Sequence, residues 1–190
     1  MTTSLSRWAA RAAVTALLCA SVAAHAQKVK FATSMGDIVV ELDAAKAPKT
    51  VANFVTYVKA GHYDGTVFHR VIPTFMIQTG GYKADLGEKP VRAPIPLESR
   101  NGLSNRRGSI AMARTNVPDS ATSQFFINVN DNLGLDQPNS RDGEGYAVFG
   151  KVVEGMDVVD KIKTVPTRAA GPHQNLPVTP VTIRKASVEK

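Results

Sequence analysis

Helical spacing of apolar residues occurs in only two stretches of the chain. The stronger one covers residues 47–60, where apolar side chains recur at i, i+3, i+4 and i+7 and form one stripe. A proline in its first turn and Gly61 after its last residue are typical of helix ends. The stripe consists of Val51, Phe54, Val55 and Val58. A second, shorter helix is predicted over residues 156–162.

The rest of the pattern predicts short β-strands separated by turn residues. Runs at 29–33 and 38–42 flank a Ser-Met-Gly-Asp turn and predict a hairpin. Residues 178–188 predict a closing strand, with Pro180 at its start or on a sheet edge. Many short strands with two helices predict a mainly β fold, a closed antiparallel barrel whose ends the helices plug. The other β-prone runs are 67–72, 75–79, 94–98, 109–114, 125–129 and 147–153.

Residues 1–26 follow a different pattern, typical of a secretory signal peptide. Two arginines precede an uncharged, mostly apolar run that is too short to span a bilayer comfortably. Ala24 and Ala26 then place small residues at the positions that a signal peptidase requires. We expect cleavage after Ala26 and no stable membrane insertion; the alternative is an anchor that stays attached. Residues 27–190 contain no repeat or linker and are expected to form one domain.

Composition and charge exclude some functions without indicating one. Apolar residues make up 43% and charged residues 21%, as in ordinary globular domains. The only cysteine, Cys19, lies in the predicted signal peptide, so the core must hold the mature fold without a disulfide. The formal net charge is +7, and cleavage would remove two arginines and no acidic residue. Because the basic residues are scattered and do not interleave with aromatic ones, we expect no nucleic-acid partner.

Motifs for metal, nucleotide or nucleophilic chemistry are missing from the sequence. Beyond the predicted signal peptide, His62, His69 and His173 have no metal-ligand spacing, and there is no HExxH motif. There is no Gly-x-Ser-x-Gly elbow, no cysteine nucleophile and no Walker or Rossmann glycine pattern. The sequence therefore predicts a protein that uses no metal and no cofactor.

Unusual residues concentrate in two stretches: the first is residues 68–81, and the second is residues 108–114, continued by residues 123–128. Arg70 has Phe68 and Ile72 at ±2, so in a strand a cation would share a face with two apolar side chains. Such a face could border a pocket. Taken by themselves, however, these residues fit better with a structural role, in which the aromatic side chains are core and Arg70 pairs with a surface carboxylate.

Five segments in these and neighbouring regions are similar, in sequence and order, to those of cyclophilins. The resemblance is closer still to the periplasmic cyclophilins of Gram-negative bacteria. It implies an eight-stranded antiparallel barrel capped by two helices, and a cofactor-independent peptidyl-prolyl cis/trans isomerase. The implied substrates are proline-containing unfolded or partly folded polypeptides that have been exported to the periplasm. The segments are residues 63–72, 75–78, 108–114, 123–128 and 146–152.

The resemblance also implies roles for individual residues. Arg70 takes the place of the catalytic arginine, and Gln78 that of the amide that binds substrate backbone. Tyr146 should close one side of the pocket. The residues that match the hydrophobic proline pocket are Phe75, Met76, Phe126 and Leu135. Those that match the neighbouring groove for the residues before the proline are Ala113, Arg114 and Gln124.

Two positions depart from cyclophilins of the human cytosolic kind. Those proteins carry a tryptophan where this chain has Gly134, and a histidine where it has Tyr146; the only tryptophan, Trp8, lies in the predicted signal peptide. Since that tryptophan is important for cyclosporin binding in the family, we expect weak cyclosporin affinity. No exposed helical seam suggests assembly, so we expect a monomer.

Two other functions compete with this interpretation. A chaperone could use the same groove to hold proline-containing segments, with isomerisation incidental. A barrel that carries an apolar ligand would need an open interior, whereas the many Val, Ile and Phe residues predict a filled one.

Overall fold

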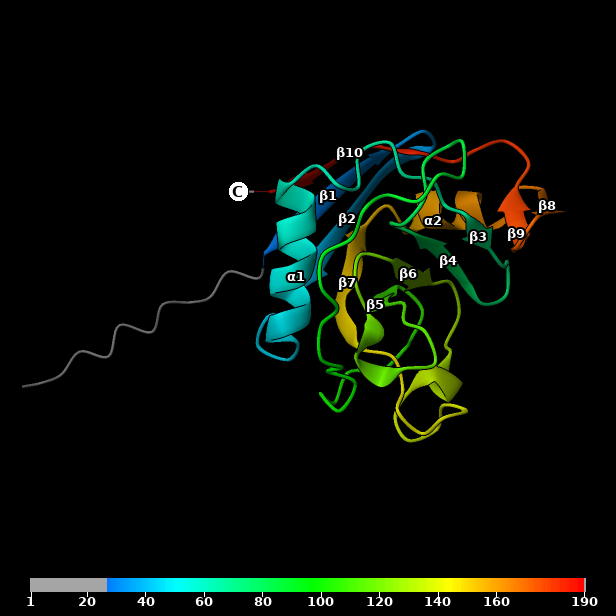
Figure 1. Cartoon of the computed structure of the whole chain (residues 1–190). Helices are drawn as coiled ribbons and strands as arrows, with labels where there is room; N and C mark the ends of the chain where they lie inside the picture. Colours follow the sequence, from blue (N-terminus) through cyan, green and yellow to red (C-terminus); the bar gives the residue numbers. More distant parts are fainter. Residues whose placement is uncertain (1–26, 190) are drawn as a thin grey trace, which may run out of the picture.

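Alternation of apolar residues along short strands produces a strongly curled sheet, seen in the computed structural model of residues 27–189 (Figure 1). Its eight strands are antiparallel, in the order β10-β1-β2-β7-β5-β6-β4-β3. The predicted signal peptide lies outside the described residues. The strands are β1 (Lys28–Thr33), β2 (Gly36–Leu42), β3 (Arg70–Val71), β4 (Met76–Thr79), β5 (Ser109–Met112), β6 (Phe125–Asn128), β7 (Val148–Glu154) and β10 (Ile183–Val188).

The two edges of the sheet meet where residues 66–68 run beside the start of β10. Val67 forms a bridge with Thr182, and the Ile183 N–H donates to the Thr66 carbonyl at 2.8 Å. Main-chain hydrogen bonds therefore join residues 65–68 to residues 181–183, whereas in the sheet order β3 itself has β4 as its neighbour. The predicted mainly β fold, with eight antiparallel strands and two helices, is confirmed.

Helix α1 (Pro48–Lys59) matches the predicted helix and packs against β10. Its apolar stripe is buried, and Gly61 follows with a positive φ of 65°. No side chain of its own caps the N-terminus. Instead the Glu98 carboxylate accepts hydrogen bonds from the backbone N–H of Lys49 at 3.1 Å and of Thr50 at 2.8 Å. This distant carboxylate satisfies two of the free N–H groups at the helix start.

Helix α2 (Met156–Lys163) also matches the prediction and packs against β2. Together the helices cover an interior that is filled by aromatic rings. Five rings pack there with centroids 4.9–6.4 Å apart in the contacting pairs. Burying each large side chain stabilises the fold by about 1.5–3 kcal/mol. The rings are Phe31, Phe54, Tyr63, Phe125 and Phe149.

A second apolar cluster lies on the opposite, outer face of the sheet. Successive side chains of a strand point to opposite faces. In β6, Phe125 and Ile127 join the interior core, whereas Phe126 joins the outer cluster. The same alternation divides β4, β5 and β7. The fully buried members of the outer cluster are Met76, Ala111, Phe126 and Val148.

Three predictions about strands were wrong. Residues 94–98 form no strand beyond one bridge at Ile95, because the two prolines that flank it have no N–H to donate. The predicted strand 67–72 is interrupted, and Phe68 turns into the core while Ile72 joins the outer cluster. Arg70 therefore does not share a face with both. The closing strand begins only at Ile183, after Pro180.

Sequence patterns also missed a two-stranded hairpin, β8 (Thr167–Ala170) and β9 (His173–Pro177). Its mostly polar strands give little hydrophobic signal. The hairpin lies against β3, at the right of Figure 1. Within the described part of the chain, no helix is long and apolar enough to cross a membrane.

Candidate active site

A row of five cross-strand partners forms the centre of the site on the outer face of the sheet. Arg70 of β3 lies opposite Gln78 of β4, and Gln78 lies opposite Phe126 of β6. Phe126 pairs with Ala111 of β5, and Ala111 with Val148 of β7. Strand register therefore places a cation, an amide and an apolar surface side by side, although they are up to 78 positions apart in sequence.

The apolar surface has a buried floor and a half-buried rim. Its floor consists of Met76, which is 1% exposed, and Phe126, which is 4% exposed. Side chains with one accessible side surround this floor. They are Ile72, Phe75, Leu103, Ala113, Leu135 and Tyr146. Six of the ten predicted site residues therefore lie in this one outer cluster: Phe75, Met76, Ala113, Phe126, Leu135 and Tyr146.

Arg70 is exposed at the margin of this cluster. Its guanidinium carbon lies 5.8 Å from the centre of the Phe75 ring, and Nη1 donates to Gln78 Oε1 at 3.4 Å. It forms no ion pair with any carboxylate of residues 27–189. The structural interpretation, a surface ion pair, is therefore not what the fold contains.

Gln78 and Gln124 continue from Arg70 as a hydrogen-bonded relay. Gln78 Nε2 donates to Gln124 Oε1 at 2.9 Å. A guanidinium has only donors, so it fixes the carbonyl end of Gln78 toward itself and the NH₂ end toward Gln124. The direction of both amides follows from Arg70.

The Arg114 side chain is the one predicted site group that the structure places out of reach. It is 1% exposed, and Nη2 pairs with Asp142 Oδ2 at 2.7 Å while Nε donates to the Gly145 carbonyl at 2.9 Å. The pair holds the pKa of Asp142 at about 2, first because of the Arg114 hydrogen bond. The guanidinium carbon also lies 4.6 Å from the centre of the Tyr146 ring. Arg114 therefore positions Tyr146, whose ring contacts Phe126 edge-on.

Hydrogen bonds to their carbonyl groups hold two rim residues, Phe75 and Leu135, in place. Asn132 Nδ2 donates to the Phe75 carbonyl at 2.7 Å and to Asn128 Oδ1 at 2.6 Å. The Leu135 carbonyl accepts the Tyr146 N–H at 3.0 Å. Gly134, beside Leu135, has open space where a side chain would stand. The rim is thus positioned by main-chain bonds but carries no large ring at that position.

On the other side of Arg70 lies a cavity of about 450 Å³ that sequence reasoning did not anticipate. Arg70, Gln78 and Gln124 form part of its lining, so it is continuous with the site just described. His69 lies in its wall and is 4% exposed. Burial, with the neighbouring His173 as a second cause, lowers the pKa of His69 to about 4. The position of His69 directly before Arg70 was the only signal in the sequence.

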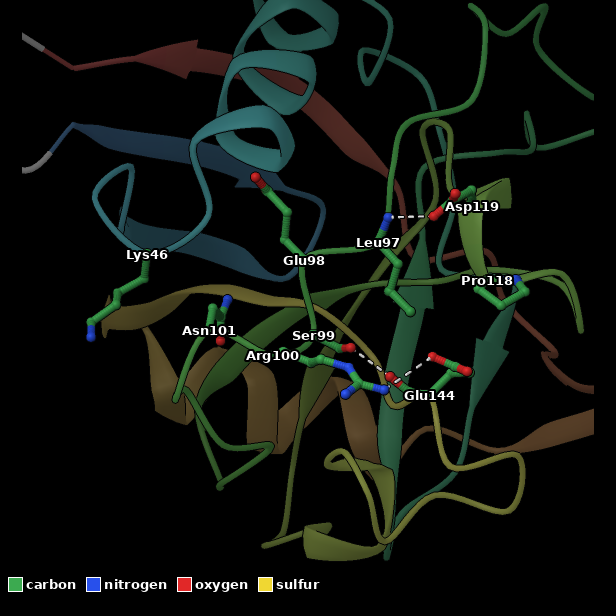
Figure 2. A pocket seen from close by; sticks show the side chains of 9 residues that line it. All are labelled: Lys46, Leu97, Glu98, Ser99, Arg100, Asn101, Pro118, Asp119 and Glu144. Carbon is green, nitrogen blue, oxygen red and sulfur yellow. Dashed lines mark hydrogen bonds and ion pairs between the residues drawn. The ribbon is translucent and has the colours of Figure 1, made fainter.

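A larger cavity of about 530 Å³ lies elsewhere and contains none of the predicted site residues (Figure 2). Its lining mixes acidic and basic side chains. Figure 2 shows that Asp119 accepts from the Leu97 N–H, Ser99 donates to the Glu144 carbonyl, and Arg100 pairs with the Glu144 carboxylate. Over residues 27–189, no group of three His, Cys, Asp or Glu side chains could hold a metal ion.

Residues 28–188 match the family described as cyclophilin type peptidyl-prolyl cis-trans isomerase/CLD. The chain belongs to the cyclophilin family. The chain is 52% identical to a peptidyl-prolyl cis-trans isomerase A of Dickeya dadantii over 93% of this chain and 92% of that one. It is 51% identical to a peptidyl-prolyl cis-trans isomerase B of Escherichia coli over 85% and 99%. The cyclophilin is thus a peptidyl-prolyl cis-trans isomerase, and enzymes of its family act on proline-containing peptides.

Solved structures agree with the fold of this cyclophilin. A crystal structure of a Cryptosporidium parvum cyclophilin type isomerase superposes with a TM-score of 0.72 at 25% identity, covering 87% of this chain and 98% of that chain. A cyclophilin from Hirschia baltica superposes with a TM-score of 0.68 and covers 84% of this chain and 73% of that chain.

Proposed function

We propose that Arg70 catalyses rotation about X–Pro bonds, with the proline ring seated on the outer apolar cluster. One observation carries this proposal: an exposed guanidinium, with no carboxylate partner among residues 27–189, lies at the margin of a buried apolar floor. A charged donor beside an apolar seat suits a substrate whose ring is apolar and whose nitrogen becomes basic during the reaction.

The chemistry needs neither a nucleophile nor a cofactor. Rotation about an amide C–N bond meets a barrier of about 18–20 kcal/mol, because amide resonance is lost. In the twisted state the proline nitrogen regains a lone pair that can accept a hydrogen bond. A donor directed at this lone pair stabilises the twisted state more than the planar one, and such a difference is what lowers a barrier.

Arg70 provides this donor with little rearrangement. Its charge is permanent and its N–H groups form a fixed fork. Gln78 and the Phe75 ring already hold it over the site. A charged hydrogen bond contributes about 1.5–3 kcal/mol, which corresponds to about one to two powers of ten in rate. The rest of the acceleration is assigned to desolvation and to gripping of the ring by the pocket: Phe75, Met76, Phe126 and Leu135.

The groups beside the pocket serve the chain before the proline. Gln78 is half-buried and presents its amide next to Arg70. Ala113 and Gln124 are also half-buried, and the Ala113 N–H donates to the Gln124 carbonyl at 3.0 Å. At Arg114 only the backbone faces solvent, so we assign it a contact through backbone and a positioning role for its side chain.

The test compares Arg70→Ala with wild type in a protease-coupled assay on a proline peptide. We expect kcat/KM to fall at least tenfold with the circular dichroism spectrum and Tm unchanged. Arg184→Ala is the matched control, because Arg184 is an exposed arginine on β10 away from the site. Near-normal activity of Arg70→Ala would refute the assignment. If that variant suppresses client aggregation fully without isomerase activity, holding, and not isomerisation, accounts for that effect.

We also propose that the substrates are exported proteins in a bacterial periplasm. The support is the signal-peptide pattern of residues 1–26, with its basic start, apolar run and small residues before position 27. Expression in a Gram-negative host should give a periplasmic protein that begins at Gln27, as read by intact mass. A full-length protein found in the cytoplasmic fraction would contradict this assignment.

A further inference from the structure

The cavity beyond Arg70 separates the catalytic groove from the β8–β9 hairpin. Its near wall consists of Arg70, Gln78 and Gln124, which also belong to the proline site. Its far wall is residues 172–175 at the turn and start of β9. A polypeptide whose proline occupies the apolar cluster therefore has this cavity next to it, on the other side of Arg70.

The near wall presents hydrogen-bond donors to the cavity. Arg70 donates to Gln78, and Gln78 donates to Gln124 Oε1. With its oxygen engaged by Gln78, Gln124 has its NH₂ group left as a donor, and Gln124 lines the cavity beside His69 and Tyr82. Because Arg70 orients the Gln78 amide and Gln78 orients the Gln124 amide, the group of Gln124 that is left over is a hydrogen-bond donor.

One residue of the same lining, His69, has an unsatisfied ring nitrogen. Nδ1 of His69 is buried and has no hydrogen-bond partner in the described part of the chain, although the residue is only 4% exposed. The ring is fixed by two aromatic neighbours, with centroids 4.7 Å from Tyr82 and 5.8 Å from His173. An unpaired buried ring nitrogen costs stability unless a ligand satisfies it.

The charge of the lining favours the same kind of ligand. Arg70 is a permanent cation, and no Asp or Glu is among the nine lining residues. The nearby Glu88 is exposed and accepts the Tyr82 hydroxyl at 2.9 Å. Pro172 is the only purely apolar contributor, so the cavity offers an apolar ligand little. Gln174 and Asn175 add two more amides from the hairpin.

We propose that this cavity is a subsite for an acidic side chain of the substrate, an Asp or Glu close in sequence to the isomerised proline. The inference rests on the proposed function, because it takes the proline to lie beside Arg70. The hairpin then acts as a specificity element: His173 and Gln174 form the far side of the carboxylate subsite, and Gln124 forms the near side.

The test uses matched proline peptides that differ only by Glu or Gln at one position, scanned over the two residues on each side of the proline. For wild type we expect kcat/KM to be at least threefold higher with Glu than with Gln at one of these positions. In the double variant His173→Ala, Gln174→Ala the ratio should return to about one. Arg168→Gln, which removes a charge from the same hairpin but not from the cavity lining, should keep the wild-type ratio.

Equal turnover of Glu and Gln peptides at every position would overturn the subsite while leaving the isomerase assignment intact. A ratio that falls as much in Arg168→Gln as in the double variant would also overturn it, because long-range charge would then explain the preference. Failure of the proposed function has a different signature, namely turnover of all peptides that is unaffected by Arg70→Ala.

Discussion

Acid should destabilise this cyclophilin in large part through the buried histidine His69. The residue is 4% exposed, and burial, followed by the nearby His173, lowers its pKa from 6.5 to about 4. The groups that face its ring are Tyr82 and His173, with Arg70 adjacent in sequence. The ring is therefore neutral in the folded protein at pH values where it is protonated in the unfolded chain.

The sign of the effect follows from the proton count. Between pH 6.5 and about 4 the unfolded chain binds more protons at His69 than the folded one, so the unfolding free energy falls as the pH falls. At about 1.4 kcal/mol per pKa unit, the full shift corresponds to about 3 kcal/mol. At pH ~4.5, just above the folded pKa, most of this shift has taken effect, so the unfolding free energy should be about 2–3 kcal/mol lower than at neutral pH. That is a large part of the stability of an ordinary domain.

Urea unfolding at about pH 7.5 and about pH 4.5 measures this loss, with His69→Gln as the variant that cannot titrate. Wild type should lose about 2–3 kcal/mol more than the variant over this range. Other groups titrate alike in both proteins and cancel. His173→Gln is the control, since it keeps the burial of His69 and so should keep most of the effect. Parallel losses in wild type and His69→Gln would show that burial does not hold the ring neutral.

Two further predictions concern ion pairs and caps. At the start of α1, the Glu98 carboxylate accepts hydrogen bonds from two backbone N–H groups and from the Thr50 hydroxyl. Glu98→Ala should therefore lower the unfolding free energy, measured in urea, by about 1–3 kcal/mol, and Glu98→Gln should lower it less. Equal stability of Glu98→Ala and wild type would refute the capping role. Arg114 depresses the pKa of Asp142 to about 2. The pair therefore stabilises the fold above pH ~4, and this stabilisation is lost as the pH falls toward ~2. Tm measured between these pH values should fall less steeply in Asp142→Asn than in wild type. A fall as steep as that of wild type would contradict this account.

Local periodicity was enough to predict the elements whose burial is one-sided. The four-residue stripe of α1 and the hairpin of β1 and β2 follow from repeats of 3.6 and 2 residues, which every residue of the element shares. The same local information failed where main-chain pairing depends on a distant partner. Residues 94–98 have no ladder to join, and β8 and β9 are polar strands that are defined by each other.

The sequence by itself predicted which residues belong to the site, because segments similar to a known family carry Arg70 and the apolar groups together. It could not determine the state of those residues. Arg70 and Arg114 are both arginines beside an aromatic ring. Arg70 is exposed and has no carboxylate partner in the part of the chain that the structure describes, whereas Arg114 is buried and paired with Asp142. Only the tertiary structure decided which arginine is paired with a carboxylate, because that pairing depends on contacts between segments far apart in the chain. The cavity behind Arg70 depends on such contacts as well, because the β8–β9 hairpin closes it from about a hundred positions away.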